Sequence, residues 1–281
     1  MKGQLNSMAF RIMTDTRKPE LPGNTTSLHR HMAIETDCAF QTKDLVKIAR
    51  VITKYVHFLD PAIVAAIAED NRENSRDWRL RLSALGVDPR LYLWEDSACC
   101  FPGVRRCLDA EKGVWRRGRR VFRDALAVDY DEYPRWVWSA LIPERAAEFE
   151  GQRYAIFHPL NHKVINAQVE ASLEENRYLD GRGLYGLFTS AANIAYAPAA
   201  LIALMNTEHW LRTLFVERQA ELYAPVSTML PPRVRVRRSP GEWNLKAFDW
   251  APCEGVADSA CVRAFLEARR VKLDALLAHN P

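Results

Sequence analysis

Glycine is scarce in this sequence, and the glycine-dependent motifs of phosphate-binding loops and serine hydrolases are missing. Twelve of the 281 residues are glycine, about 4% where soluble proteins average roughly 7%. The patterns GxxxxGK and GxSxG do not occur, and the spacing GxGxxG occurs only in GRGLYG at 181–186, which is predicted to lie in a helical region and not at a strand-to-helix turn. No dinucleotide-binding sheet, phosphate-binding loop or serine-hydrolase elbow is therefore indicated. These features disfavour kinases, hydrolases and dinucleotide-dependent enzymes.

Paired cysteines and long apolar runs are missing as well. No two cysteines have the CxxC spacing of zinc ribbons. No apolar run approaches the ~18 residues of a membrane-spanning helix, and the start, MKGQLNSMAFRIMTD, lacks the pattern of a secretory signal. We therefore expect a cytoplasmic protein with reduced thiols and no membrane association. The six cysteines are Cys38, Cys99, Cys100, Cys107, Cys253 and Cys261.

Lysine is the third residue type in short supply. Nine of the 39 basic residues are lysine, which leaves 30 arginines, and the formal net charge is only +4. Arginine suits bidentate contacts with phosphate and stacking on bases, although a GC-rich genome would produce the same bias. The net charge by itself does not indicate a nucleic-acid partner, so any evidence for such a partner must come from the positions of the arginines in the sequence.

Hydrophobic periodicity predicts an α+β protein that is predominantly helical, with a few short strands and no doubly wound nucleotide-binding sheet. Asp60-Pro61 is typical of a capped helix start, and Gly86 of a helix end. We expect one compact unit over 1–281, with a possible boundary near the polar stretch 129–134 that would separate 1–128 from 135–281. Helices are expected over 43–58, 61–85, 97–113, 114–126, 143–151, 159–175, 182–196, 198–223 and 258–278, and strands over 8–13, 32–40, 91–94, 135–141, 152–157 and 231–238.

The stretch Val114–Leu126, VWRRGRRVFRDAL, carries five arginines. On a helical wheel its apolar residues form one arc, and the arginines form the other, where Asp124 is the only acid. Like charges repel unless an anion covers them, so this face is suited to tracking a phosphate backbone. Alternatively, the acids Asp129, Asp131 and Glu132 fold back to pair with it. The arginines are Arg116, Arg117, Arg119, Arg120 and Arg123.

A second basic face is predicted in the strand PPRVRVRR. Arg233, Arg235 and Arg237 alternate with two valines, so the arginines share one face of the strand. This face could also bind phosphate, or it could protect an exposed strand edge from aggregation.

Arg153 and His158 stand five positions apart in RYAIFH. This spacing resembles the Arg-x4-His motif of HEPN-type ribonucleases. The resemblance implies that Arg153 holds the scissile phosphate and that His158 transfers a proton without a metal, usually across a dimer. That family carries the motif on a helix with a polar residue after the arginine, whereas here Tyr154 follows and the segment is predicted to be a strand.

Several histidines could ligate a metal, but the sequence does not indicate that any three ligands meet. We therefore predict no metal and no cofactor. Cys99 and Cys100 have no nearby histidine to act as a base, and no catalytic residue is assigned beyond Arg153 and His158. The possible metal ligands are His29 and His31 with Glu35, and His158 and His162 with Glu208 or His209.

The interpretation that best fits these features is a non-enzymatic nucleic-acid-binding protein, a subunit or accessory factor of a larger assembly. It would contact backbone phosphates of RNA or DNA through the two arginine faces. A different class of function remains open, a protein–protein adaptor whose arginines pair with acidic partner surfaces. The metal-independent ribonuclease is the third hypothesis.

Overall fold

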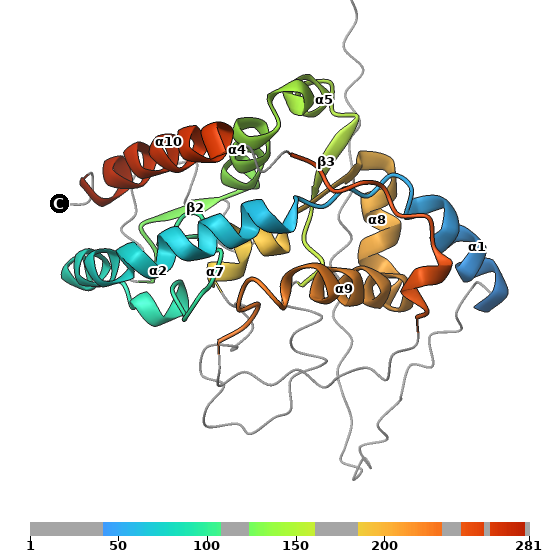
Figure 1. The fold of residues 1–281 in the computed structure, drawn as a ribbon, viewed down its shortest axis with the longest axis horizontal. Helices are drawn as coiled ribbons and strands as arrows, with labels where there is room; N and C mark the ends of the chain where they lie inside the picture. Colours follow the sequence, from blue (N-terminus) through green and yellow to red (C-terminus); the bar gives the residue numbers. More distant parts are fainter. Residues whose placement is uncertain (1–41, 108–123, 161–184, 232–242, 256–258, 279–281) are drawn as a thin grey trace, which may run out of the picture. The chain divides into compact units, whose positions relative to one another are not determined.

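The computed structural model describes residues 42–107, 124–160, 185–231, 243–255 and 259–278. Residues 1–39 and 40–281 form separate units, and all described residues belong to the second. This unit has a helix-rich α+β fold (Figure 1). Its longer elements are α1 (Thr42–Ile52), α2 (Pro61–Ala84), β1 (Val104–Arg106), β2 (Ala127–Asp129), α4 (Glu132–Leu141), α5 (Ala146–Glu150), β3 (Tyr154–Phe157), α7 (Tyr185–Phe188), β4 (Ala195–Pro198), α8 (Ala199–Thr207), α9 (His209–Tyr223) and α10 (Ser259–Ala278), and its 3-10 helices are η1 (Pro89–Leu91), η3 (Pro143–Arg145), η5 (Ala191–Asn193) and η6 (Leu245–Ala247).

Helix α2 begins and ends at the residues that the sequence predicts. The Asp60 carboxylate accepts a hydrogen bond from the Ala62 amide at 2.8 Å, and Pro61 occupies the first turn, where no amide donor is needed. At the other end Gly86 has φ +76°, a left-handed conformation that glycine adopts without a steric penalty. The Trp78 and Leu82 side chains of this helix are buried.

The described strands form two separate two-stranded sheets. Strands β1 and β2 are parallel, with Arg105 opposite Val128, and β3 and β4 are antiparallel, with Ile156 opposite Tyr196. A parallel pair needs a long crossover connection, and here it runs from Cys107 to Leu126, through the arginine-rich stretch.

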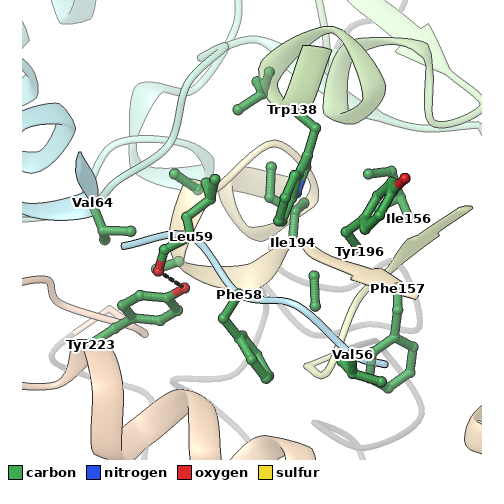
Figure 2. Packing of buried hydrophobic residues seen from close by; sticks show 14 of the residues in the cluster. Val56, Phe58, Leu59, Val64, Trp138, Ile156, Phe157, Ile194, Tyr196 and Tyr223 are labelled. Carbon is green, nitrogen blue, oxygen red and sulfur yellow. Dashed lines mark hydrogen bonds between the residues drawn. The ribbon is translucent and has the colours of Figure 1, made fainter. Parts of the chain in front are cut away.

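The larger hydrophobic core surrounds the extended segment between α1 and α2 (Figure 2). His57 exchanges two 2.9 Å backbone hydrogen bonds with Tyr196 of β4, and the Tyr223 hydroxyl of α9 donates to the Leu59 carbonyl at 2.8 Å. The Trp138 ring of α4 stacks on Tyr196 with a centroid distance of 5.2 Å. Segments far apart in the sequence therefore converge on this one segment.

A second core cluster lies where α2, the first sheet and α10 meet. It includes Trp78 of α2, Val128 of β2, Tyr185 of α7 and Leu273 of α10. Figure 1 shows α10 lying beside α4, and α10 packs against both α2 and α4. No helix among the described residues is long and apolar enough to cross a membrane.

Several sequence-based predictions of elements are wrong. Residues 135–141, predicted to be a strand, belong to α4, because Val137, Trp138 and Leu141 form one buried helical face. Residues 97–107, predicted to be helical, form a loop and β1, and residues 91–94 form no strand. The helix predicted over 198–223 is interrupted at Glu208. The predicted helix over 114–126 does not include Asp124–Leu126, which lie beside β1 in extended and turn conformations.

Candidate functional site

The eight arginines of the two predicted basic faces lie outside the described residues, and so do His29, His31, Glu35, His162 and the strands predicted over 8–13 and 32–40. The structure does describe the two ends between which the arginine-rich stretch runs. We call these ends, Val104–Cys107 and Asp124–Asp129, the crossover root. The arginines outside the described residues are Arg116, Arg117, Arg119, Arg120, Arg123, Arg233, Arg235 and Arg237.

A buried ion pair connects the two ends that form the crossover root. Arg105 in β1 is 2% exposed. Its guanidinium donates two hydrogen bonds to the Asp124 carboxylate, at 3.1 Å from Nε and at 3.2 Å from Nη2. The Tyr185 hydroxyl donates to the same carboxylate at 2.8 Å. Burial alone would raise the pKa of Asp124, but Arg105 and Tyr185 hold it below its ordinary value. The only acid on the predicted arginine face thus binds a buried arginine of the protein body.

Asp129 and Asp131, which the sequence offers as alternative partners of the arginine face, also have partners among the described residues. The Asp129 side chain accepts hydrogen bonds from the amides of Glu132 and Tyr133, at 3.2 and 2.9 Å, and so caps α4. Asp131 lies 3.2 Å from Nε2 of His158 and 3.6 Å from the Arg106 guanidinium. Burial raises the pKa of Asp129. Burial would also raise that of Asp131, but His158 and Arg106 lower it overall.

His158 is buried at the end of β3. Its Nδ1 lies 3.3 Å from the Asn193 carbonyl oxygen, while its Nε2 faces Asp131. Both ring nitrogens of His158 therefore lie within hydrogen-bond distance of an oxygen atom of the protein.

The structure does not bring Arg153 and His158 together. Arg153 is exposed just before β3 and His158 is buried just after it, so about 16 Å of extended chain separates their α-carbons, and their side chains emerge on opposite faces. The strand predicted for this segment is confirmed. The arrangement gives no support to one catalytic site that uses both residues.

Exposed basic residues lie next to the crossover root. The Arg106 side chain is 52% exposed, and Arg135 on the first turns of α4 is exposed as well. Both lie close enough to Asp131 to lower its pKa. Glu132 is an exposed acid in the same region. The root and its surroundings therefore carry charges of both signs, and Arg106 and Arg135 are the exposed cations among them.

A second polar cluster was not found from the sequence. Arg145 contacts the Glu254 carboxylate at 2.8 Å and that of Glu148 at 3.4 Å, and Tyr196 donates a hydrogen bond to Glu148. His57 Nδ1 lies 2.8 Å from the Glu254 carboxylate but forms no hydrogen bond. Burial lowers the pKa of His57 despite the charge of Glu254. The cluster joins the segment between α1 and α2 to α5 and to residues before α10.

Two buried arginines, Arg269 and Arg212, were also not predicted from the sequence. Arg269 is 0% exposed and contacts Asp70 at 2.9 Å and the Asn71 amide oxygen at 2.6 Å. A sequence signal existed, because Arg269 stands in the apolar helical series of Phe265 and Leu273 in α10. An arginine on the core face of a helix predicts a buried partner.

The described residues do not contain a group of three or more histidine, cysteine or acidic side chains that could hold a metal ion. Glu208 lies at the interruption between α8 and α9. Burial raises the pKa of Cys99 to about 11 and that of Cys100 to about 12, so both are unreactive thiols at neutral pH. No family model, curated protein or solved structure matches this chain.

Proposed function

We propose that this protein binds nucleic acid through backbone phosphates, with the arginine-rich crossover between β1 and β2 as the main contact surface and Arg106 and Arg135 beside it. The observation that carries the proposal is the parallel pairing of β1 with β2. This pairing and the buried Arg105–Asp124 pair attach both ends of the stretch to the hydrophobic core. A basic segment held at both ends loses less conformational entropy on binding than a free tail.

The partners of the neighbouring acids support the proposal over internal neutralisation. Asp124 binds Arg105, Asp129 caps α4, and Asp131 binds His158 and Arg106. Each of these carboxylates already stabilises a group of the body, so turning any of them toward the arginine stretch would break a buried contact. An external polyanion is the better counter-charge for five arginines. The basic strand of Arg233, Arg235 and Arg237 is proposed as a second phosphate contact.

The test is a fluorescence-anisotropy titration of labelled single- and double-stranded RNA and DNA at several salt concentrations. The variant replaces Arg116, Arg119 and Arg120 with glutamate. We expect the wild type to bind with a steep salt dependence. In the variant, the slope of log K against log salt should fall by about 3 for duplex DNA, since each lost phosphate contact contributes roughly 0.9.

The matched control replaces three exposed basic residues far from this stretch in sequence, Arg50, Arg76 and Lys246, with glutamate. It changes the net charge equally, so an effect of overall charge would appear in both variants. The proposal fails if both variants lose affinity to the same degree, or if the wild type binds no nucleic acid at low salt. A stoichiometric protein partner that survives nuclease treatment and is lost in the first variant would instead establish the adaptor function.

A further inference from the structure

Arg212 is a buried cation without a described counter-ion. The residue is 2% exposed, and its Nη1 donates to the carbonyl oxygens of His158 and Pro159 at 3.2 and 3.3 Å. Its Nη2 donates to the Asn206 amide oxygen, and its Nε has no hydrogen-bond partner. All these acceptors are neutral. No described carboxylate forms an ion pair with Arg212, whereas the equally buried Arg269 has Asp70 at 2.9 Å.

Burial without a counter-charge disfavours the ionised guanidinium. It lowers the pKa of Arg212 to about 10, and no neighbouring acid opposes this effect. Neutral carbonyl groups satisfy hydrogen bonds but do not cancel a full charge. A protein that keeps such a charge in its interior gains stability when an anion binds beside it.

The N-terminus of α9 supplies a second positive feature at the same place. The 15-residue helix begins at His209 after Glu208, which forms no side-chain cap, and its first turn contains no acid. The amides at such an end carry a partial positive charge and can bind an anion. Arg212 lies in this first turn, and its bond to Asn206 in the last turn of α8 places the guanidinium across the interruption between the two helices.

We propose that the interruption between α8 and α9 is a binding site for a small oxyanion, a phosphate or a carboxylate group, held by Arg212 and by the first amides of α9. Glu208 and Trp210, at the start of α9, are half-buried. The site is distinct from the proposed nucleic-acid surface, since Arg212 is too deeply buried to contact a polymer backbone. The two proposals therefore stand or fall separately.

The experiment measures the thermal unfolding midpoint of the full chain in inorganic phosphate, and in acetate as a carboxylate probe, against chloride at the same ionic strength. We expect phosphate or acetate to raise the wild-type midpoint with a saturating concentration dependence. This rise should be absent in Arg212→Met, which keeps the apolar stem. The control is Arg218→Met on the same helix, because Arg218 already pairs with Glu221 at 2.6 Å. That variant should keep the full response.

Two results would overturn the site: no response of the wild type to either anion, or an equal response in wild type and Arg212→Met. If Arg212→Met does not fold, Arg212→Lys replaces it. Lysine keeps the charge but lacks the planar fork of donors, so we expect the apparent Kd for the anion to rise at least tenfold, and an unchanged Kd would contradict the proposal. In every folded variant, nucleic-acid affinity should equal that of the wild type.

Discussion

The Arg105–Asp124 pair should be among the most strongly coupled ion pairs in the described part of the chain. The Arg105 side chain is 3% exposed and that of Asp124 is 22% exposed. Asp124→Asn removes the negative charge that faces the buried guanidinium and weakens two hydrogen bonds, which should lower the free energy of unfolding by about 3 kcal/mol. Arg105→Met removes the charge together with its need for a partner. The double variant should therefore be more stable than the sum of the single effects predicts, by about 1–3 kcal/mol.

The assay is a double-mutant cycle by urea unfolding, followed by tryptophan fluorescence at constant pH and salt. The exposed Lys47–Asp44 pair is the control, because these side chains are 77% and 51% exposed and its coupling should not exceed about 0.5 kcal/mol. The reasoning is refuted if the Arg105–Asp124 coupling is no larger than that of this control. Such a result would mean that the Arg105–Asp124 ion pair does not stabilise the crossover root. The proposed nucleic-acid surface would then lose the support of this ion pair.

Three further predictions follow from single residues. The lowered pKa of Asp131 means that its contribution to stability is complete above about pH 4, the ordinary pKa of an unfolded aspartate, and disappears as the pH falls through the lower folded value. The difference in urea midpoint between wild type and Asp131→Asn should therefore shrink between pH 5 and pH 3. Gly186→Ala would place a methyl group 2.4 Å from the Trp94 ring and should lower the free energy of unfolding by about 3 kcal/mol or more. Gly86→Ala meets no atom within 4 Å and should lower it by only ~1 kcal/mol, through backbone strain. Equal losses of stability in the two variants would contradict the packing argument. Native-state alkylation followed by mass spectrometry should leave Cys100 unmodified, because it is buried and its pKa is about 12.

The elements that were predicted correctly are those whose signals are local. Asp60-Pro61 and Gly86 bound α2 through effects within one helical turn, namely a side-chain cap and a left-handed glycine. The same holds for α10, whose apolar residues keep a helical spacing over 20 residues. Neither prediction required knowledge of a distant contact.

The secondary-structure predictions that are wrong concern segments whose conformation depends on contacts with residues far away in the sequence. In residues 135–141, Trp136 and Trp138 alternate with smaller residues, which suggested a strand. Trp136 is nevertheless half-buried against Phe265 of α10, while Trp138 is buried against Tyr196 of β4. Because α4 packs against partners on two sides, its apolar residues cover a wide arc of the helix. The alternation of large and small residues therefore does not indicate a strand here. Strand β1 is stabilised by its pairing with β2 and by the close approach of Leu126 to Gly103. Because β2 and Leu126 lie about twenty residues further along the sequence, the residues immediately around β1 do not predict this strand.

The roles of individual arginines are the least predictable feature from composition. Arg105 and Arg106 are neighbours in the sequence, yet β1 directs the first into the core and leaves the second half-exposed. Because side chains alternate along a strand, the pattern could show that they differ but not which one is buried. What distinguishes the buried arginines is their counter-charge: Arg105 and Arg269 each have an aspartate, and Arg212 has only neutral acceptors among the described residues. An arginine paired with a buried carboxylate contributes to the stability of the fold, whereas Arg212, whose acceptors among the described residues are neutral, is the arginine for which we propose an external anion.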